Sequence, residues 1–158
     1  MTETILKMQK KVKRYLDKDR YDHTIGVMHT AGCLAMRYGA NLEQALTAGL
    51  LHDCAKCVPA DEKIKLCEKN HIEISDAEYK NPGLLHAKLG AFFARKKYGI
   101  ENEEILRSIE SHTTGRPNMS LLDKIIYIAD YIEPGRDVAP NLPEVRALAF
   151  VDIDACLY

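Results

Sequence analysis

The run GLLHDCAK, residues 49–56, places a histidine and an aspartate at the end of an apolar helical stretch. Upstream, Leu42 and Ala45 recur at helical spacing and share a face with His52. Small residues on that face would let a neighbouring helix approach closely. Side chains of adjacent helical residues point about 100° apart, so His52 and Asp53 can both reach one bound ion only if it lies between their two directions.

Apolar residues recur at helical spacing on both sides of this run, and strict alternation is nearly absent. We therefore expect the all-α fold class, as a compact helical bundle. The pattern predicts helices over residues 5–16, about 22–38, 42–56, about 61–70, 84–98, 103–112 and 120–132. The stretch 72–83 is less regular, although Ser75 and Glu78 are spaced as a capping box.

The end of the sequence carries one more helical signal, because Asp152 could cap a helix that Tyr158 would cut short. We expect one domain over residues 1–158, with its motifs in about 21–136 and an incomplete C-terminal helix.

Composition excludes several classes of function. The net charge is −1, so no overall field attracts nucleic acid or an anionic membrane. Aromatic residues make up 7% with no Trp, which disfavours a stacking platform for single strands. The sequence contains no apolar run of the ~18 residues that a membrane span needs, and no signal peptide. Five cysteines are an odd number and cannot all pair within one chain. We therefore expect reduced thiols and a cytoplasmic protein.

Further histidines and an aspartate fall on inward helical faces: His23, His86, His112 and Asp130. Asp130 lies deep in an apolar helix, where an uncompensated carboxylate costs several kcal/mol, and a metal ion would supply the missing charge. One inward histidine is more often a hydrogen-bonded core residue than a ligand. Four histidines and two aspartates on five helices favour a metal site, and imidazole with carboxylate suits iron, manganese or zinc.

The order His23, His52-Asp53, Asp130 resembles the H…HD…D motif of HD-domain phosphohydrolases. More specifically, the sequence resembles the YqeK family, the symmetrical diadenosine tetraphosphate hydrolases of bacteria. The segments that carry this resemblance are residues 21–23, 49–56, 85–87, 111–115 and 130–136. They span most of the chain. The two additional histidine segments, 85–87 and 111–115, and the run ADYIEPGR, residues 129–136, make the match to this family specific.

The resemblance implies a binuclear divalent metal centre, with iron as the expected metal and manganese or another divalent ion as the alternative. His23, His52, Asp53 and Asp130 would bind one ion, and Asp53 would bridge to a second ion held by His86 and His112. The implied reaction is the hydrolysis of diadenosine tetraphosphate to two ADP. The expected partner is therefore a small nucleotide, with no nucleic acid and no membrane, and a homodimer is compatible with this reading.

Residues near the motifs are candidates for contacts with the phosphates. Lys56 lies on the face of His52 and Asp53, and we assign the catalytic roles to Asp53 and Lys56. Candidate substrate-binding residues are Lys56, Thr113, Thr114 and Arg136. The alternatives are a surface role for the lysine and a salt bridge from the arginine to Asp130 or Glu133.

Three other functions stay open from the sequence. An HD hydrolase could act on a guanosine polyphosphate or a deoxynucleotide, since base choice depends on the shape of a pocket. A di-iron centre on such a scaffold could instead activate oxygen. A non-catalytic nucleotide-binding module is the third, although its usual sign would be a damaged His-Asp pair, and here residues 52–53 are intact.

Overall fold

The computed structural model describes residues 1–157, and all regular structure in that range is helical. The elements in chain order are α1 (Glu3–Val12), α2 (Lys18–Tyr38), α3 (Leu42–Leu51), α4 (Ala60–Lys69), α5 (Asp76–Lys80), the 3-10 helix η1 (Pro82–Leu84), α6 (Leu85–Tyr98), α7 (Glu103–Ser111), α8 (Leu121–Ile132), α9 (Leu142–Ala149) and the 3-10 helix η2 (Ala155–Leu157). The predicted all-α class is confirmed.

Three predicted helix boundaries were wrong. Helix α1 ends at Val12 rather than at residue 16. Helix α2 begins at Lys18 rather than near residue 22, because the Asp17 side chain accepts a hydrogen bond from the backbone N–H of Arg20 and caps the helix. Helix α3 ends at Leu51, and residues 52–58 continue in tighter turns, in which the N–H of Lys56 donates to the carbonyl of Asp53. His23 therefore lies inside a helix, while the His-Asp pair follows the end of one.

The capping signals near residues 75 and 152 have different outcomes. The predicted capping box of Ser75 and Glu78 is confirmed and opens α5. The Asp152 side chain accepts hydrogen bonds from the N–H groups of Asp154 and Ala155, but the element that follows is the short η2. Any continuation at Tyr158 lies outside the described residues.

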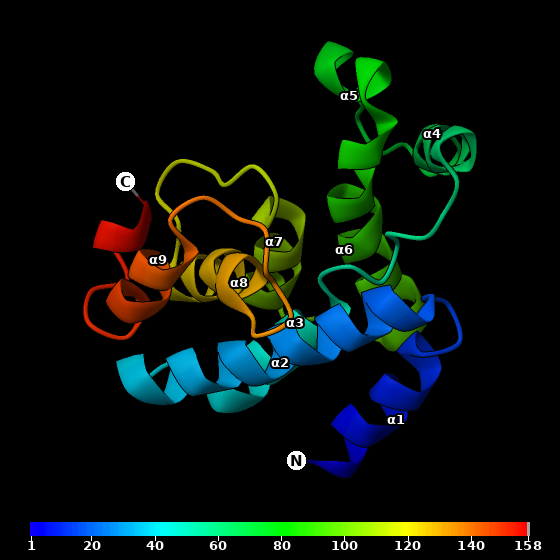
Figure 1. Cartoon of the computed structure of the whole chain (residues 1–158). Helices are drawn as coiled ribbons and strands as arrows, with labels where there is room; N and C mark the ends of the chain where they lie inside the picture. Colours follow the sequence, from blue (N-terminus) through cyan, green and yellow to red (C-terminus); the bar gives the residue numbers. More distant parts are fainter. Residues whose placement is uncertain (158) are drawn as a thin grey trace.

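The long helix α2 crosses the lower part of the molecule and packs against α3 and α8, as Figure 1 shows. Helix α7 lies behind the centre and contacts α3, α6 and α8. Helices α4 and α5 pack against the outer part of α6 and η1, away from α9 and the C-terminus. Helices α2, α3, α6, α7 and α8 thus converge on the middle of the molecule.

A glycine permits the close packing of α3 against α2. A Cβ atom on Gly49 of α3 would lie 2.9 Å from the Cα atom of Met28 in α2, a distance that side chains do not adopt. Ala45 and Ala48 on the same helix are fully buried. The small residues expected from the sequence therefore let α3 lie directly against the backbone of α2, which brings the end of α3 beside His23.

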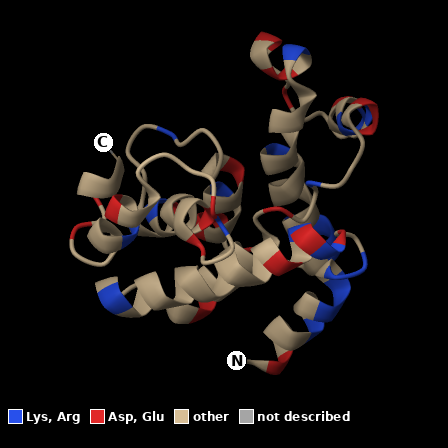
Figure 2. Cartoon of the chain, viewed as in Figure 1, with Lys and Arg blue, Asp and Glu red and all other residues tan. Residues whose placement is uncertain are grey.

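Acidic and basic residues are interspersed over most of the chain, with basic residues gathered towards the end of α1 (Figure 2). Within residues 1–157, no helix combines the length and the apolar character that a membrane crossing requires.

Candidate metal centre

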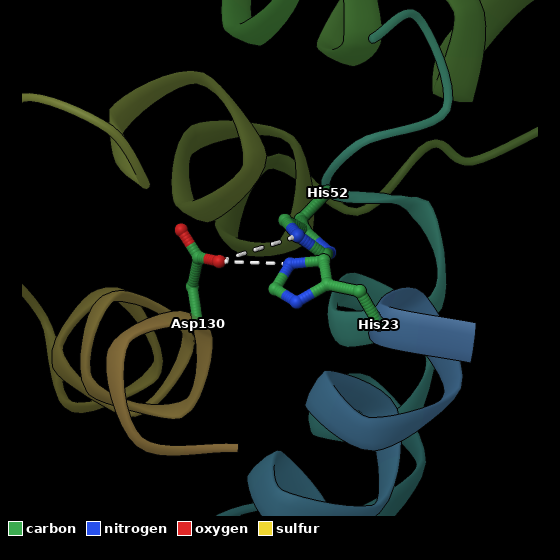
Figure 3. Close-up of side chains that lie close together, drawn as sticks. All are labelled: His23, His52 and Asp130. Carbon is green, nitrogen blue, oxygen red and sulfur yellow. Dashed lines mark ion pairs between the residues drawn. The ribbon is translucent and has the colours of Figure 1, made fainter. Parts of the chain in front are cut away.

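Six side chains from different helices and turns meet at the middle of the bundle: His23, His52, Asp53, His86, His112 and Asp130. Figure 3 shows three of them, with Asp130 facing the two imidazole rings of His23 and His52. Asp130 Oδ1 lies 3.0 Å from His23 Nε2 and 3.8 Å from His52 Nε2. The side chain of Asp130 is 20% exposed and that of His52 is fully buried, so this end of the cluster opens towards Asp130.

Asp53 connects this group to the other two histidines. Its Oδ2 atom lies 3.5 Å from His52 Nε2 and 3.9 Å from His23 Nε2. Its Oδ1 atom lies 3.2 Å from His86 Nε2 and 3.4 Å from His112 Nε2. One carboxylate therefore presents one oxygen to each pair of histidines.

The ring orientations fix which nitrogen is available. In three histidines Nδ1 lies 2.6–2.7 Å from the carbonyl oxygen three residues earlier, and these pairs are His52–Gly49, His86–Gly83 and His112–Ile109. A carbonyl oxygen only accepts, so Nδ1 carries the proton and the lone pair of the neutral ring is on Nε2. The Nε2 atoms of His86 and His112 nevertheless lie only 3.1 Å apart. Two lone pairs at this distance repel each other, and a cation between or beside them would remove the repulsion.

Unsatisfied buried atoms support the same conclusion. Among residues 1–157, the buried atoms His23 Nε2, His52 Nε2 and Asp53 Oδ1 lack a partner in hydrogen-bond geometry, even though charged groups lie nearby. Such groups normally have a partner. Two sets of donor atoms lie within 4.8 Å of one another, namely His23, His52 and Asp130, and His52, Asp53 and His112. The donors present are thus compatible with a divalent metal site.

The electrostatics of the cluster favour a carboxylate at Asp53. Burial opposes ionisation of Asp53, but attraction to His52 and the other nearby histidines outweighs it and holds the pKa of this carboxyl well below its usual value. Burial lowers the pKa of His52, but attraction to Asp53 and Asp130 outweighs burial and raises this pKa. Burial also lowers the pKa of His112 and favours its neutral imidazole. A carboxylate and a neutral imidazole are the forms that bind metal ions.

The candidate catalytic and substrate-binding residues lie at different distances from the cluster. Lys56 Nζ lies 3.3 Å from His86 Nε2, and the Thr113 hydroxyl lies 3.2 Å from the same nitrogen. Thr114 is exposed and its hydroxyl points to the carbonyl of Gly115. Arg136 forms the ion pair with Asp130 that was one alternative for this residue, at 2.9 Å.

Two polar residues of the site were not singled out from the sequence. Arg20 donates to Asp53 Oδ2 at 2.8 Å, one helical turn before His23. Arg20 lies three residues before His23, and this helical spacing would have indicated the role if α2 had been predicted to begin directly after Asp17. Glu133 is buried and lies 3.0 Å from His23 Nδ1. It had been considered only as a partner of Arg136.

Two cavities flank the cluster. One, of about 560 Å³, lies beyond Thr113 between α5, α6 and the loop after α7, and its lining includes Lys88, Arg107 and Thr114. The other, of about 510 Å³, is lined by Arg20, His23 and Arg136, among others. Both carry basic side chains that could contact an anionic ligand, together with acidic ones: Glu78 and Glu110 in the first, and Asp17, Asp19, Glu133 and Asp137 in the second.

Comparison with known proteins gives concordant results. Residues 20–135 match the HD domain family. The chain is 45% identical over 146 residues to a Halalkalibacterium halodurans protein named symmetrical bis(5'-nucleosyl)-tetraphosphatase, covering 92% of this chain and 77% of that protein. A Bacillus subtilis protein of the same name is 43% identical with the same coverage.

A solved structure from Clostridium acetobutylicum, described as a predicted HD superfamily hydrolase involved in NAD metabolism, has a TM-score of 0.91 at 46% identity. The alignment covers 96% of this chain and 79% of that one. With the family match over residues 20–135 and the shared helical fold, these likenesses show that this chain belongs to the HD domain family.

Proposed function

We propose that this protein is a metal-dependent phosphohydrolase that cleaves diadenosine tetraphosphate symmetrically, consuming one water and releasing two ADP. The single observation that carries the proposal is the buried cluster in which the two oxygens of Asp53 face two separate pairs of histidine Nε2 atoms. The names of the relatives at 43–45% identity supply the substrate class.

The cluster would hold two divalent ions. His23, His52 and Asp130 would bind one, His86 and His112 the other, and Asp53 would be shared. We propose iron as the metal, with manganese as the alternative, since mixed imidazole and carboxylate ligands suit both. When bound, a pair of such ions supplies a water activated as a nucleophile and positive charge for the phosphate oxygens.

The chain's own cations would orient the phosphates. Lys56 and Thr113 lie beside His86 and can donate to a phosphate oxygen on that side. The side chains of Arg20 and Arg136 are 30% and 40% exposed at the mouth of the other cavity, and planar guanidinium groups can hold phosphate oxygens in a bidentate manner. These side chains would align the central phosphoanhydride with Asp53.

The two cavities suggest how a two-fold symmetrical substrate is accommodated. We propose that one nucleoside half occupies the cavity of Lys88 and Arg107, and the other the cavity of Arg20 and Arg136. Cleavage at the centre would then release one ADP on each side, and Thr114 would contact the half that lies beyond Thr113.

The domain bounds, the location and the oligomeric state are further predictions from the sequence. We propose one HD domain over residues 1–158, with the motifs within about 21–136. The cytoplasmic location and the homodimer expected from the sequence also remain predictions.

Product analysis tests the function directly. Protein purified without oxygen should contain iron or manganese and should convert diadenosine tetraphosphate to ADP alone, at the same rate with and without oxygen. AMP with ATP would contradict symmetrical cleavage. A requirement for oxygen would favour the oxygen-activating alternative. Hydrolysis of a guanosine polyphosphate or a deoxynucleotide, without hydrolysis of diadenosine tetraphosphate, would show that the substrate is a different nucleotide. Bound metal without turnover of any of these would favour a binding module.

A further inference from the structure

We propose that Glu133 is a positioning residue, which orients His23 and keeps the lone pair of its ring on Nε2 for a metal ion. The inference rests on the metal centre proposed above. Glu133 would act through His23 rather than bind metal or substrate itself. The four histidines of the cluster differ in the group that lies at Nδ1.

His23 lacks the backbone partner that the other three histidines use. His52 and His112 directly follow the ends of α3 and α7, and His86 lies in the first turn of α6. At these helix ends, the carbonyl three residues earlier accepts from Nδ1. His23 lies within α2, where the carbonyl of Arg20 belongs to the hydrogen-bond ladder of the helix. Its Nδ1 needs an acceptor from another element.

Glu133 supplies that acceptor from the end of α8. Its Oε1 atom lies 3.0 Å from His23 Nδ1, and its Oε2 atom accepts the N–H of Gly135 at 2.6 Å. Only 3% of the residue is exposed, so water does not compete for the carboxylate. Both oxygens therefore accept, and a carboxylate meets this requirement where an amide cannot.

Two glycines make room for this side chain. A Cβ atom on Gly26, one turn after His23, would lie 2.3 Å from Glu133 Oε2. A Cβ atom on Gly135 would lie 3.0 Å from the same oxygen. Both glycines thus leave space for the carboxylate in its observed position, and a methyl group at either one would push it away from His23.

The position of the proton on His23 follows from these contacts. An acceptor at Nδ1 places the ring proton there and leaves the lone pair on Nε2, which faces Asp130 Oδ1 at 3.0 Å. A metal ion, or in its absence a second ring proton, would lie between this nitrogen and the carboxylate of Asp130. An outer carboxylate that holds a ligating imidazole also raises its basicity, and loss of such partners weakens metal binding about 10–100-fold.

The replacement Glu133→Gln gives a sharp test, because the glutamine oxygen is needed at the N–H of Gly135. Its NH₂ group then faces His23 Nδ1 and donates to it, which moves the ring proton to Nε2 and blocks the ligating atom. Glu133→Ala removes the partner without imposing the wrong proton position. We would titrate the wild type and both variants with Mn²⁺ alone and measure the melting temperature of each.

We expect the Mn²⁺ affinity and the melting temperature to rank the two variants differently. Glu133→Gln should weaken binding of one Mn²⁺ ion about 10-fold or more, at least as much as Glu133→Ala, although the glutamine variant fills the space and melts at the higher temperature. Wild-type affinity in Glu133→Gln, or an affinity between those of the wild type and Glu133→Ala, would overturn the positioning role.

Asp123→Asn is the matched control. It changes another buried carboxylate of α8 to an amide, and its partners are Arg116 and Ser120 rather than a histidine. It should lower the melting temperature and leave Mn²⁺ affinity unchanged. If Glu133→Gln does not fold, Gly26→Ala displaces the carboxylate while keeping its charge, and it should also weaken binding. A wild type that binds neither Mn²⁺ nor, without oxygen, Fe²⁺ would refute the metal centre itself, whereas unchanged binding in the variants would refute only the role of Glu133.

Discussion

The two halves of the cluster share Asp53 but differ in their donors and in the charges around them. Asp130 and Glu133 flank the ring of His23 in the first half, where the guanidinium groups of Arg20 and Arg136 pair with Asp53 and Asp130. In the second half, His86 is surrounded by the Lys56 ammonium, the Thr113 hydroxyl and a backbone carbonyl. Because the first half has Asp130 as an additional carboxylate donor, it should bind its cation more tightly, and the second half should leave room for an anionic substrate beside Lys56.

Loss of the shared carboxylate should have the largest effect. Asp53→Ala removes a donor from both halves, so bound metal should disappear and hydrolysis should fall about 10³-fold or more, which corresponds to about 4 kcal/mol of transition-state stabilisation. Metal analysis and a rate measurement test this. The control Asp61→Ala changes a carboxylate that pairs with Lys65 on the surface and should have no effect. Retained metal and activity in Asp53→Ala would refute the shared site.

Removing one histidine from each half should distinguish the two ions. His86→Ala should keep one tightly bound Mn²⁺ and lose the weaker one, because the donors around Asp130 remain. His23→Ala should lose the tight ion, since its ring faces the carboxylate of Asp130. Calorimetric titration gives both affinities. Equal affinities in the two variants would show that the additional carboxylate of Asp130 does not control binding.

Arg136 should influence substrate more than metal. Arg136→Ala removes a guanidinium from the mouth of the cavity, and we expect KM to rise about 10-fold, equal to about 1.4 kcal/mol, with metal content unchanged. The matched control is Arg95→Ala, because Arg95 is 45% exposed and also pairs with a carboxylate, that of Glu103. Loss of metal in Arg136→Ala would show instead that its main role is to hold Asp130 in place.

The smallest effect is expected from a hydroxyl in the second half. Thr113→Val keeps the shape of the side chain and removes an oxygen 3.1 Å from His112 Nε2, at a cost of about 1 kcal/mol, or roughly a 5-fold lower kcat/KM. Thr114→Val makes the same chemical change at an exposed position and should cost less. A larger effect at Thr114 would move the main phosphate contact outward into the cavity.

The sequence predicted the helical class and the family because both depend on local information. Helical spacing gives the direction of each side chain, and the order of His23, His52-Asp53 and Asp130 along the chain is read directly. The start of α2 was misplaced because the cap at Asp17 was overlooked, and Arg20 was missed with it. The metal-binding role of the cluster remains a prediction, since the structure brings its donors together without testing what they bind.

Sequence by itself therefore determined which residues can face the interior, because the period of a helix is a local property. Only the packing of the helices established which of these residues meet. Glu133 lies 110 residues after His23, and its role depends on the turn after α8 and on the space left by Gly26. The two cavities likewise depend on the angles between helices, which no short segment specifies.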